Sequence, residues 1–124
     1  MKAASFISAR NVLLFSLVAE GATAVAVILV PGLVAQLLIG ADVAGAGVAY
    51  GRVFGVTLLA LVIACWPRTG AVPRPALYAV LFYNLAVGLY LAYVGVVHRP
   101  TGILLWPAVA EHALIAVAVR VRDH

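Results

Sequence analysis

Long, almost uncharged stretches of apolar residues are the feature that most limits how this chain can fold. Four of them follow one another, and most of the charges lie outside them, in the short connecting segments and near the two ends of the chain. Each is about 20 residues long, the length with which a helix crosses roughly 30 Å of hydrocarbon. Hydrophobic residues make up 66% of the 124 residues and charged residues only 10%, which excludes a water-soluble domain of this size. The sequence therefore predicts a polytopic membrane protein.

The predicted fold is an all-α bundle of four transmembrane helices in one membrane domain, residues 1–124. Pro31-Gly32 follows the first stretch and predicts either a kink or a short interfacial turn over residues 31–39. The N-terminal region has features of a secretory signal, but apolar sequence continues to Val30, so we expect an uncleaved membrane helix. The four predicted helices cover about residues 11–30, 43–65, 75–97 and 103–119.

Lysines and arginines are distributed unevenly between the segments outside the apolar stretches. If the N-terminus is cytoplasmic, the cytoplasmic segments hold six of them and the outer segments hold only Arg99. The positive-inside rule then predicts that the N-terminus and the C-terminus are both cytoplasmic, in a multi-pass protein of the bacterial cytoplasmic (inner) membrane. The six residues are Lys2, Arg10, Arg68, Arg74, Arg120 and Arg122.

Charge and cysteine usage exclude several other classes. The net charge of +4 does not indicate nucleic acid, because the basic residues stand singly or in pairs at the ends of apolar runs. The single cysteine, Cys65, excludes an intrachain disulfide and a thiolate-rich metal site. No second histidine lies at the depth of His112, so we expect no metal and no cofactor. Because four such helices enclose little volume, we expect the lipid-embedded chain to form a homo-oligomer or join a larger membrane complex.

Every apolar stretch contains a strongly polar residue near its middle. The rise per residue places these groups at about one depth, roughly 15 Å into the bilayer. A charge at that depth costs at least about 2.5 kcal/mol, so we expect the groups to face inward and pair. The pattern predicts an ion pair between Glu20 and Arg52, with Glu111 sharing the guanidinium. The candidate residues for binding a ligand or a proton are Glu20, Arg52, Tyr83, Asn84, Glu111 and His112.

Small residues recur at helical spacing and predict where the helices pack closely. Gly47, Gly51 and Gly55 are four residues apart in the second stretch, which favours close approach of another helix. In the third stretch, Gly88 follows Asn84 at the same spacing. Polar residues of the first stretch form a stripe on one helix face, namely Ser16, Glu20 and Thr23.

Several short motifs stand out along the chain. They are Glu20-Gly21, Pro31-Gly32-Leu33, Gly51-Arg52 with Gly55, Tyr83-Asn84, and Leu105-Trp106-Pro107-Ala108 followed by His112. With them the chain resembles small bacterial four-helix membrane proteins that are broadly DoxX-like, over nearly its whole length. That resemblance implies a four-helix bundle and no particular activity. The small multidrug resistance transporters also have four helices and a glutamate that Glu20 would match, but they lack buried charges equivalent to Arg52 and Glu111.

Three functions are open to a small bundle with such a polar layer. The one we favour is the binding or transport of a small molecule or proton, in which Glu20 or Glu111 changes protonation. The second is an accessory or structural subunit of a larger complex, with the polar layer fixing helix register. The third is a membrane enzyme that acts on an isoprenoid or another lipid, with Glu20 or Glu111 and His112 as acid and base. No signature motif supports the enzyme, so we expect a protein without catalytic activity.

Overall fold

The computed structural model describes residues 8–99 and 102–122, and this part of the chain is helical with no β-strand. The predicted all-α fold is confirmed. The long helices match the predicted apolar stretches to within about three residues at each end, and a short helix lies where a kink or turn was expected. The five helices in these residues are α1 (Ala9–Leu29), α2 (Pro31–Leu38), α3 (Ala46–Cys65), α4 (Arg74–Val97) and α5 (Leu105–Arg122).

Three of the helices in the described residues, α1, α3 and α4, are long and apolar enough to cross a membrane. The prediction of a membrane protein therefore agrees with the helix lengths and compositions. α5 differs from these three, since its 18 residues include Glu111, Arg120 and Arg122. A fourth span is thus not established by composition alone.

Local chemistry explains where the first helices begin and end. Ser8 caps α1, because its hydroxyl oxygen accepts a hydrogen bond of 3.1 Å from the backbone N–H of Asn11. Pro31 has no N–H to continue α1, so the chain turns at Val30 and Pro31 becomes the first residue of α2. α2 ends before Gly40, whose φ of +70° suits a residue without a side chain.

α3 begins at Ala46 rather than at the predicted residue 43. Gly45, the residue before the helix, has a φ of +54°, a backbone conformation that cannot belong to an α-helix. The preceding loop is held against α2, because the side-chain amide of Gln36 donates a hydrogen bond to the carboxylate of Asp42. α3 therefore begins later than predicted, after a loop that is hydrogen-bonded to α2.

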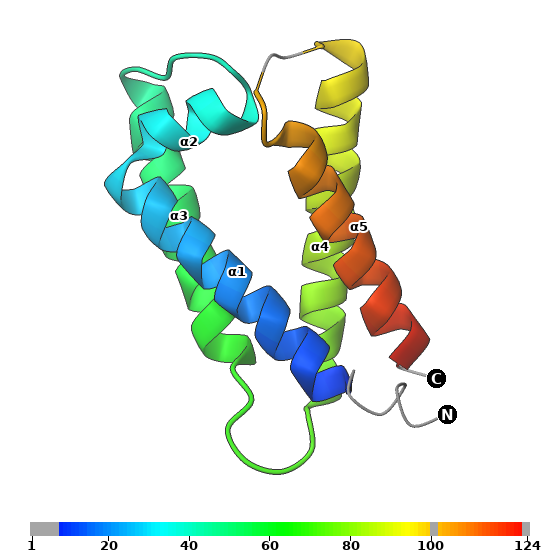
Figure 1. The fold of residues 1–124 in the computed structure, drawn as a ribbon. Coiled ribbons are helices and arrows are strands. Elements are labelled where there is room, and N and C mark those ends of the chain that lie inside the picture. The colour runs from blue at the N-terminus through cyan, green and yellow to red at the C-terminus, as the bar shows by residue number, and fades with distance from the viewer. Residues whose placement is uncertain (1–7, 100–101, 123–124) are drawn as a thin grey trace.

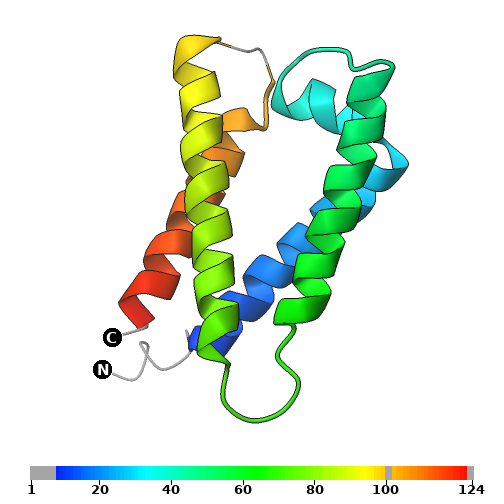
Figure 2. The same ribbon diagram turned by 180° about the vertical axis from the view of Figure 1, so that it is seen from behind.

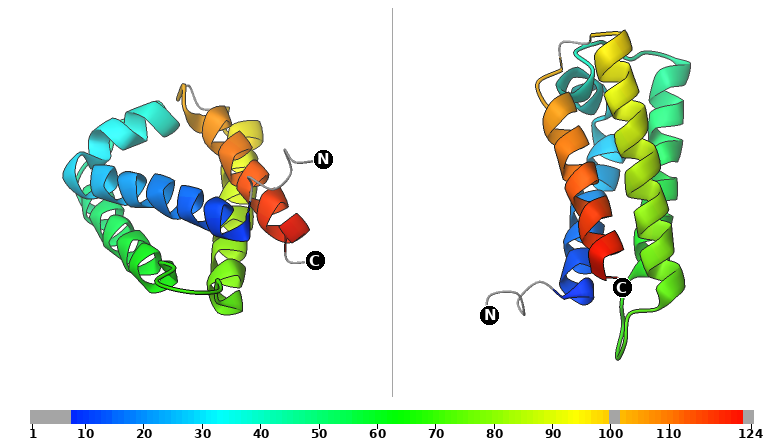
Figure 3. Two further views of the ribbon diagram at one scale, coloured as in Figure 1. Left: turned by 60° about the horizontal axis from the view of Figure 1, so that its bottom comes forward. Right: turned by 90° about the vertical axis from the view of Figure 1, so that its right-hand side faces the viewer.

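The long helices pack as two pairs, α1 with α3 and α4 with α5 (Figure 1). The pairs approach each other where α1 begins and diverge toward the end where α2 lies, which the view from behind also shows (Figure 2). The loop between α3 and α4 extends from the end where α1 begins (Figure 3). The first residues of α1 and the last of α5 lie at that same end (Figures 1 and 3).

The apolar core lies at the end where the helix pairs meet, and we call this region the packed half. Its residues come from the N-terminal halves of α1 and α4 and the C-terminal halves of α3 and α5. They are Val12, Leu13, Leu17, Val62, Cys65, Ala76, Leu77, Val80, Ile115 and Val119. Contact among these side chains holds the two helix pairs together, because lipid tails leave dispersion and shape as the main forces between helices.

Candidate functional site

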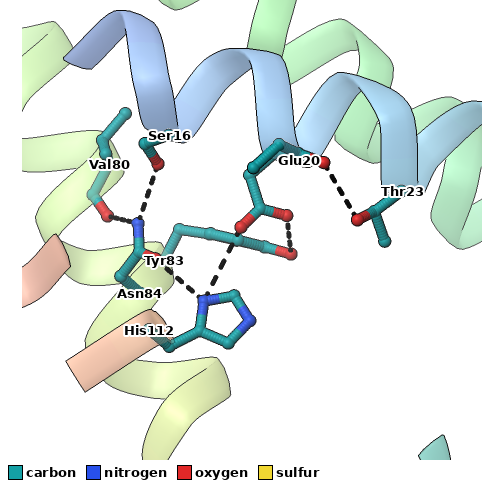
Figure 4. Close-up of polar contacts among 8 residues, drawn as sticks. Ser16, Glu20, Thr23, Val80, Tyr83, Asn84 and His112 are labelled. Atoms are coloured by element: carbon teal, nitrogen blue, oxygen red, sulfur yellow. Dashed lines mark hydrogen bonds and ion pairs between the residues drawn. The ribbon is translucent and has the colours of Figure 1, made fainter. Parts of the chain in front are cut away.

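Asn84 lies at the centre of a hydrogen-bond network that joins α1, α4 and α5 (Figure 4). Its side chain is fully buried. Its amide nitrogen donates to the backbone carbonyl of Val80 at 2.8 Å and to the hydroxyl of Ser16 at 3.3 Å. The amide oxygen lies 2.8 Å from Nδ1 of His112. The amide nitrogen and the amide oxygen of Asn84 therefore both have hydrogen-bond partners, which lie on α1, on α5 and on α4 itself.

This network fixes the tautomer of His112. A backbone carbonyl can only accept a hydrogen bond, so the atom of the Asn84 amide that contacts the carbonyl of Val80 must be the nitrogen. The oxygen of Asn84 then faces His112 and can only accept, so Nδ1 of His112 is the donor. In the neutral ring Nε2 keeps its lone pair, and Figure 4 shows this second nitrogen turned away from Asn84 and Glu20.

Glu20 is held by Tyr83 and His112. The hydroxyl of Tyr83 donates a hydrogen bond of 3.0 Å to Oε2 of Glu20. The other oxygen, Oε1, lies 3.6 Å from Nδ1 of His112 and forms an ion pair with it when the ring is protonated. One turn along α1, the hydroxyl of Thr23 donates to the backbone carbonyl of Ala19 at 3.0 Å. Glu20 is thus a buried carboxylate with donors on two other helices.

A cavity of about 700 Å³ extends from this network to α2. Its volume is in the range typical of sites for small organic ligands. Five polar residues line one end: Glu20, Thr23, Tyr83, Glu111 and His112. The rest of the wall is formed by Ala26, Val34, Leu37, Leu38, Phe54, Ala86, Val87, Tyr90, Leu91, Leu104, Pro107 and Ala108. The cavity is therefore amphipathic, with one polar end and a long wall that is apolar except for the hydroxyl of Tyr90.

Glu111 lines the same cavity but belongs to no hydrogen bond or ion pair with the residues that the structure describes. It directly precedes His112 in α5 and lines the same end of the cavity as Glu20. The structure thus brings four of the six sequence-predicted residues to one end of one cavity, and a fifth, Asn84, is buried behind them and hydrogen-bonded to His112. The unpaired carboxylate among them is the one most available to an occupant.

The predicted ion pair between Glu20 and Arg52 is wrong, and so is the sharing of Arg52 by Glu111. Arg52 is exposed, and its Nε donates a hydrogen bond of 3.2 Å to the backbone carbonyl of Ile28. Ile28 lies in the last turn of α1, where carbonyls have no N–H of the same helix to accept from and the helix dipole attracts positive charge. Arg52 therefore caps α1 and takes no part in the cavity wall.

Two of the four predicted packing glycines lie at close contacts between long helices. A side chain at Gly55 would meet the backbone of Ala24 in α1, and one at Gly88 would meet Cβ of His112 in α5. Gly51 faces Pro31 at the start of α2, while Gly47 faces Val43 in the loop before its own helix. Gly88 thus positions α5, and with it His112, against α4.

The residues that close the far end of the cavity have no recognisable signal in the sequence. The backbone N–H of Leu104 donates to the carbonyl of Leu37 at 2.8 Å and joins α2 to the segment before α5. A side chain at Gly102 would overlap the backbone of Leu38, so only glycine fits this junction. A glycine in a loop, such as Gly102, does not indicate which backbone segment it will pack against.

No protein-family model, curated protein or solved structure that we compared with the chain matches it. Among the residues described, no three histidines, cysteines or carboxylates are grouped as a metal site would require.

Proposed function

We propose that this chain is a multi-pass membrane protein whose cavity binds or transports a small molecule or proton near the middle of the bilayer. Glu20, Asn84 and His112 are close to the middles of α1, α4 and α5. If these helices cross the membrane, the polar end of the cavity lies near the bilayer centre. Polar groups gathered at that depth most often mark a path or a site for a substrate or an ion.

α5 is the proposed fourth span. Its 18 residues give a length of about 27 Å, nearly the thickness of the hydrocarbon core. Arg120 is in its last turn, where a long basic side chain can reach the interface, and Arg122 is its last residue, which leaves Glu111 as the charge inside the span. The first turn of α1, which includes Arg10, and the loop between α3 and α4, which includes Arg68, lie at this same end of the bundle, which supports the cytoplasmic assignment of both termini. A DoxX-like family, a bacterial inner membrane and a homo-oligomer or larger complex remain part of the proposal.

The unpaired carboxylate of Glu111 is the observation that carries the proposal. A purely structural polar layer pairs its charges, because an unpaired charge away from water is strongly unfavourable. Glu20 has partners on two neighbouring helices, whereas Glu111 faces the cavity without one among the described residues. An occupant of the cavity, a small molecule or a proton, would satisfy it.

The binding test uses three probes of similar size that differ only in their polar head: phenylbutylamine, phenylbutanol and phenylbutyrate. Calorimetric titration of the purified protein in detergent should give saturable binding of at least one of them. Ala108→Phe fills the cavity and should abolish that binding. The heat that remains when this variant is titrated measures uptake of the probe by the detergent micelle. Ala110→Phe, on the same helix but exposed and outside the cavity wall, is the matched control and should bind as the wild type does.

Two results contradict binding of a small molecule in this cavity. One is the absence of saturable binding for all three probes. The other is equal binding by the A108F and A110F variants, which would place the bound probe elsewhere on the protein.

Proton transport has its own test in proteoliposomes that carry a potassium diffusion potential and an internal pH dye. Glu111→Gln should reduce the proton flux, because the amide cannot take up or release a proton. Ala110→Gln, which changes an exposed residue of the same helix outside the cavity wall, should leave the flux unchanged. Equal proton fluxes in E111Q and in the wild type would contradict proton transport through Glu111.

A further inference from the structure

The hydrogen-bond donors at the polar end of the cavity are already used inside the protein. Thr23 donates its hydroxyl proton to Ala19, and Tyr83 donates its own to Glu20. His112 donates Nδ1–H to the amide oxygen of Asn84. A ligand that reaches this end therefore finds few groups able to donate a hydrogen bond to it.

The acceptors at the same end remain open. Both carboxylate oxygens of Glu111 are without a partner among the described residues. His112 is only 7% exposed, yet its Nε2 has no partner there either. Since no fully buried side-chain nitrogen or oxygen in the described residues lacks a partner, Nε2 must open onto the cavity that His112 lines. A ligand that donates hydrogen bonds would satisfy these acceptors.

The charge of the cavity selects among such donors. The described residues of its wall include Glu20 and Glu111 but no lysine and no arginine. Arg52, which the sequence placed beside Glu20, is bound to the end of α1 instead. An anion would be repelled by two carboxylates in surroundings of low dielectric constant, and a neutral group would leave their charge unbalanced. A cation with N–H groups meets both requirements.

The remaining wall favours an apolar body and gives it a way in. Phe54 on α3 and Tyr90 on α4 line the cavity although 43% and 66% of their surfaces are exposed. The opening therefore lies between α3 and α4, which pack little against each other. In the proposed topology this opening faces the lipid, and the two aromatic rings can attract a cation that passes them.

We infer that the ligand of this cavity is an apolar molecule that carries a protonated amine, an inference that depends on the proposed binding function. The apolar body lies against the wall formed by α2, α4 and α5. The ammonium group has N–H donors for the two open acceptors, the carboxylate of Glu111 and Nε2 of His112, and Glu20 adds a second negative charge at the same end of the cavity. The molecule enters from the lipid between α3 and α4.

The same three probes test this inference. Phenylbutylamine should bind the wild type at least about tenfold more tightly than phenylbutanol, because hydrogen bonds between charged groups are the strong ones. Glu111→Gln should weaken the amine by about tenfold and the alcohol by less than about threefold, since the hydroxyl loses only a hydrogen-bond acceptor whereas the ammonium group also loses its counter-charge. Glu111 has no internal partner in the described residues, so this variant should fold normally. Glu20→Gln should also weaken the amine, provided that its thermal unfolding matches the wild type.

The outcomes separate this inference from the proposed function. If phenylbutanol or phenylbutyrate binds most tightly, and A108F abolishes that binding, the cavity is a binding site but the amine is wrong. If phenylbutylamine binds most tightly but E111Q does not weaken it, the inference is also wrong. If no probe binds, both the inference and the small-molecule function fail.

Discussion

The packed half and the cavity half of the bundle use the same four long helices in opposite ways. In the packed half, side chains such as Leu13 and Leu77 are buried between the helix pairs. In the cavity half, apolar side chains of the same helices, such as Val87 and Leu91, line the cavity instead. The polar network around Asn84 lies at the boundary between them. The difference suggests that one half holds the helices in register so that the other can stay open, and variants in the two halves should therefore act on different properties.

The largest effect should come from truncating a leucine in the packed half. Leu17 is 1% exposed, and Leu17→Ala should lower the free energy of unfolding by about 2–3 kcal/mol because it leaves a cavity in the core. Leu91→Ala, which only enlarges an existing cavity, should lower it by less than about 0.5 kcal/mol. Reversible unfolding in mixed micelles, followed by circular dichroism, measures both. Equal losses would show that the two halves are not packed differently.

A smaller effect is expected at the boundary between the halves. Asn84→Ala removes the hydrogen bonds to Ser16, Val80 and His112 and should destabilise the fold by about 1–2 kcal/mol. Ser16→Ala removes only the longest of these bonds, so it should cost about 0.5 kcal/mol under the same conditions. If both variants lose the same stability, Asn84 does not organise the network.

An effect on stability smaller than that at Asn84, and no effect on binding, is expected at Arg52. Arg52→Met keeps the apolar stem but removes the donor to Ile28 at the end of α1, with a loss of about 0.5–1 kcal/mol. Binding of phenylbutylamine should not change, because Arg52 is not part of the cavity wall. A change in amine affinity as large as that of E111Q would show that Arg52 takes part in the binding site and would contradict the separate roles of the packed half and the half that holds the cavity.

Helix positions and most of the candidate site could be predicted from the sequence, because both depend on spacing along one helix at a time. The lengths of the apolar stretches predicted the helices. Depth along each stretch predicted that Glu20, Tyr83, Glu111 and His112 lie together, as they do at one end of the cavity, with Asn84 hydrogen-bonded to His112 behind them.

Arg52 is not beside Glu20 because its position also depends on where α1 ends and α3 begins, which depth along a stretch does not give. Depth alone placed it beside Glu20, but α3 begins later than predicted and α1 ends at Leu29 with free carbonyls nearby. A guanidinium takes the nearest acceptors it can reach, and the carbonyl of Ile28 is one of them. The closure of the cavity by α2 and Leu104 depends on a backbone contact between distant segments, which no local pattern encodes.

Accessibility of two alanines on α5 tests most directly the claim that one half is open and the other packed. Ala108 lines the cavity, whereas Ala116 lies two turns further along, 3% exposed. Each is replaced by cysteine in a Cys65→Ala background, and the protein in lipid nanodiscs is treated with a cationic methanethiosulfonate. Ala108→Cys should react at least about ten times faster than Ala116→Cys, since thiol reactivity follows exposure. Equal rates at the two positions would contradict an open cavity in this bundle.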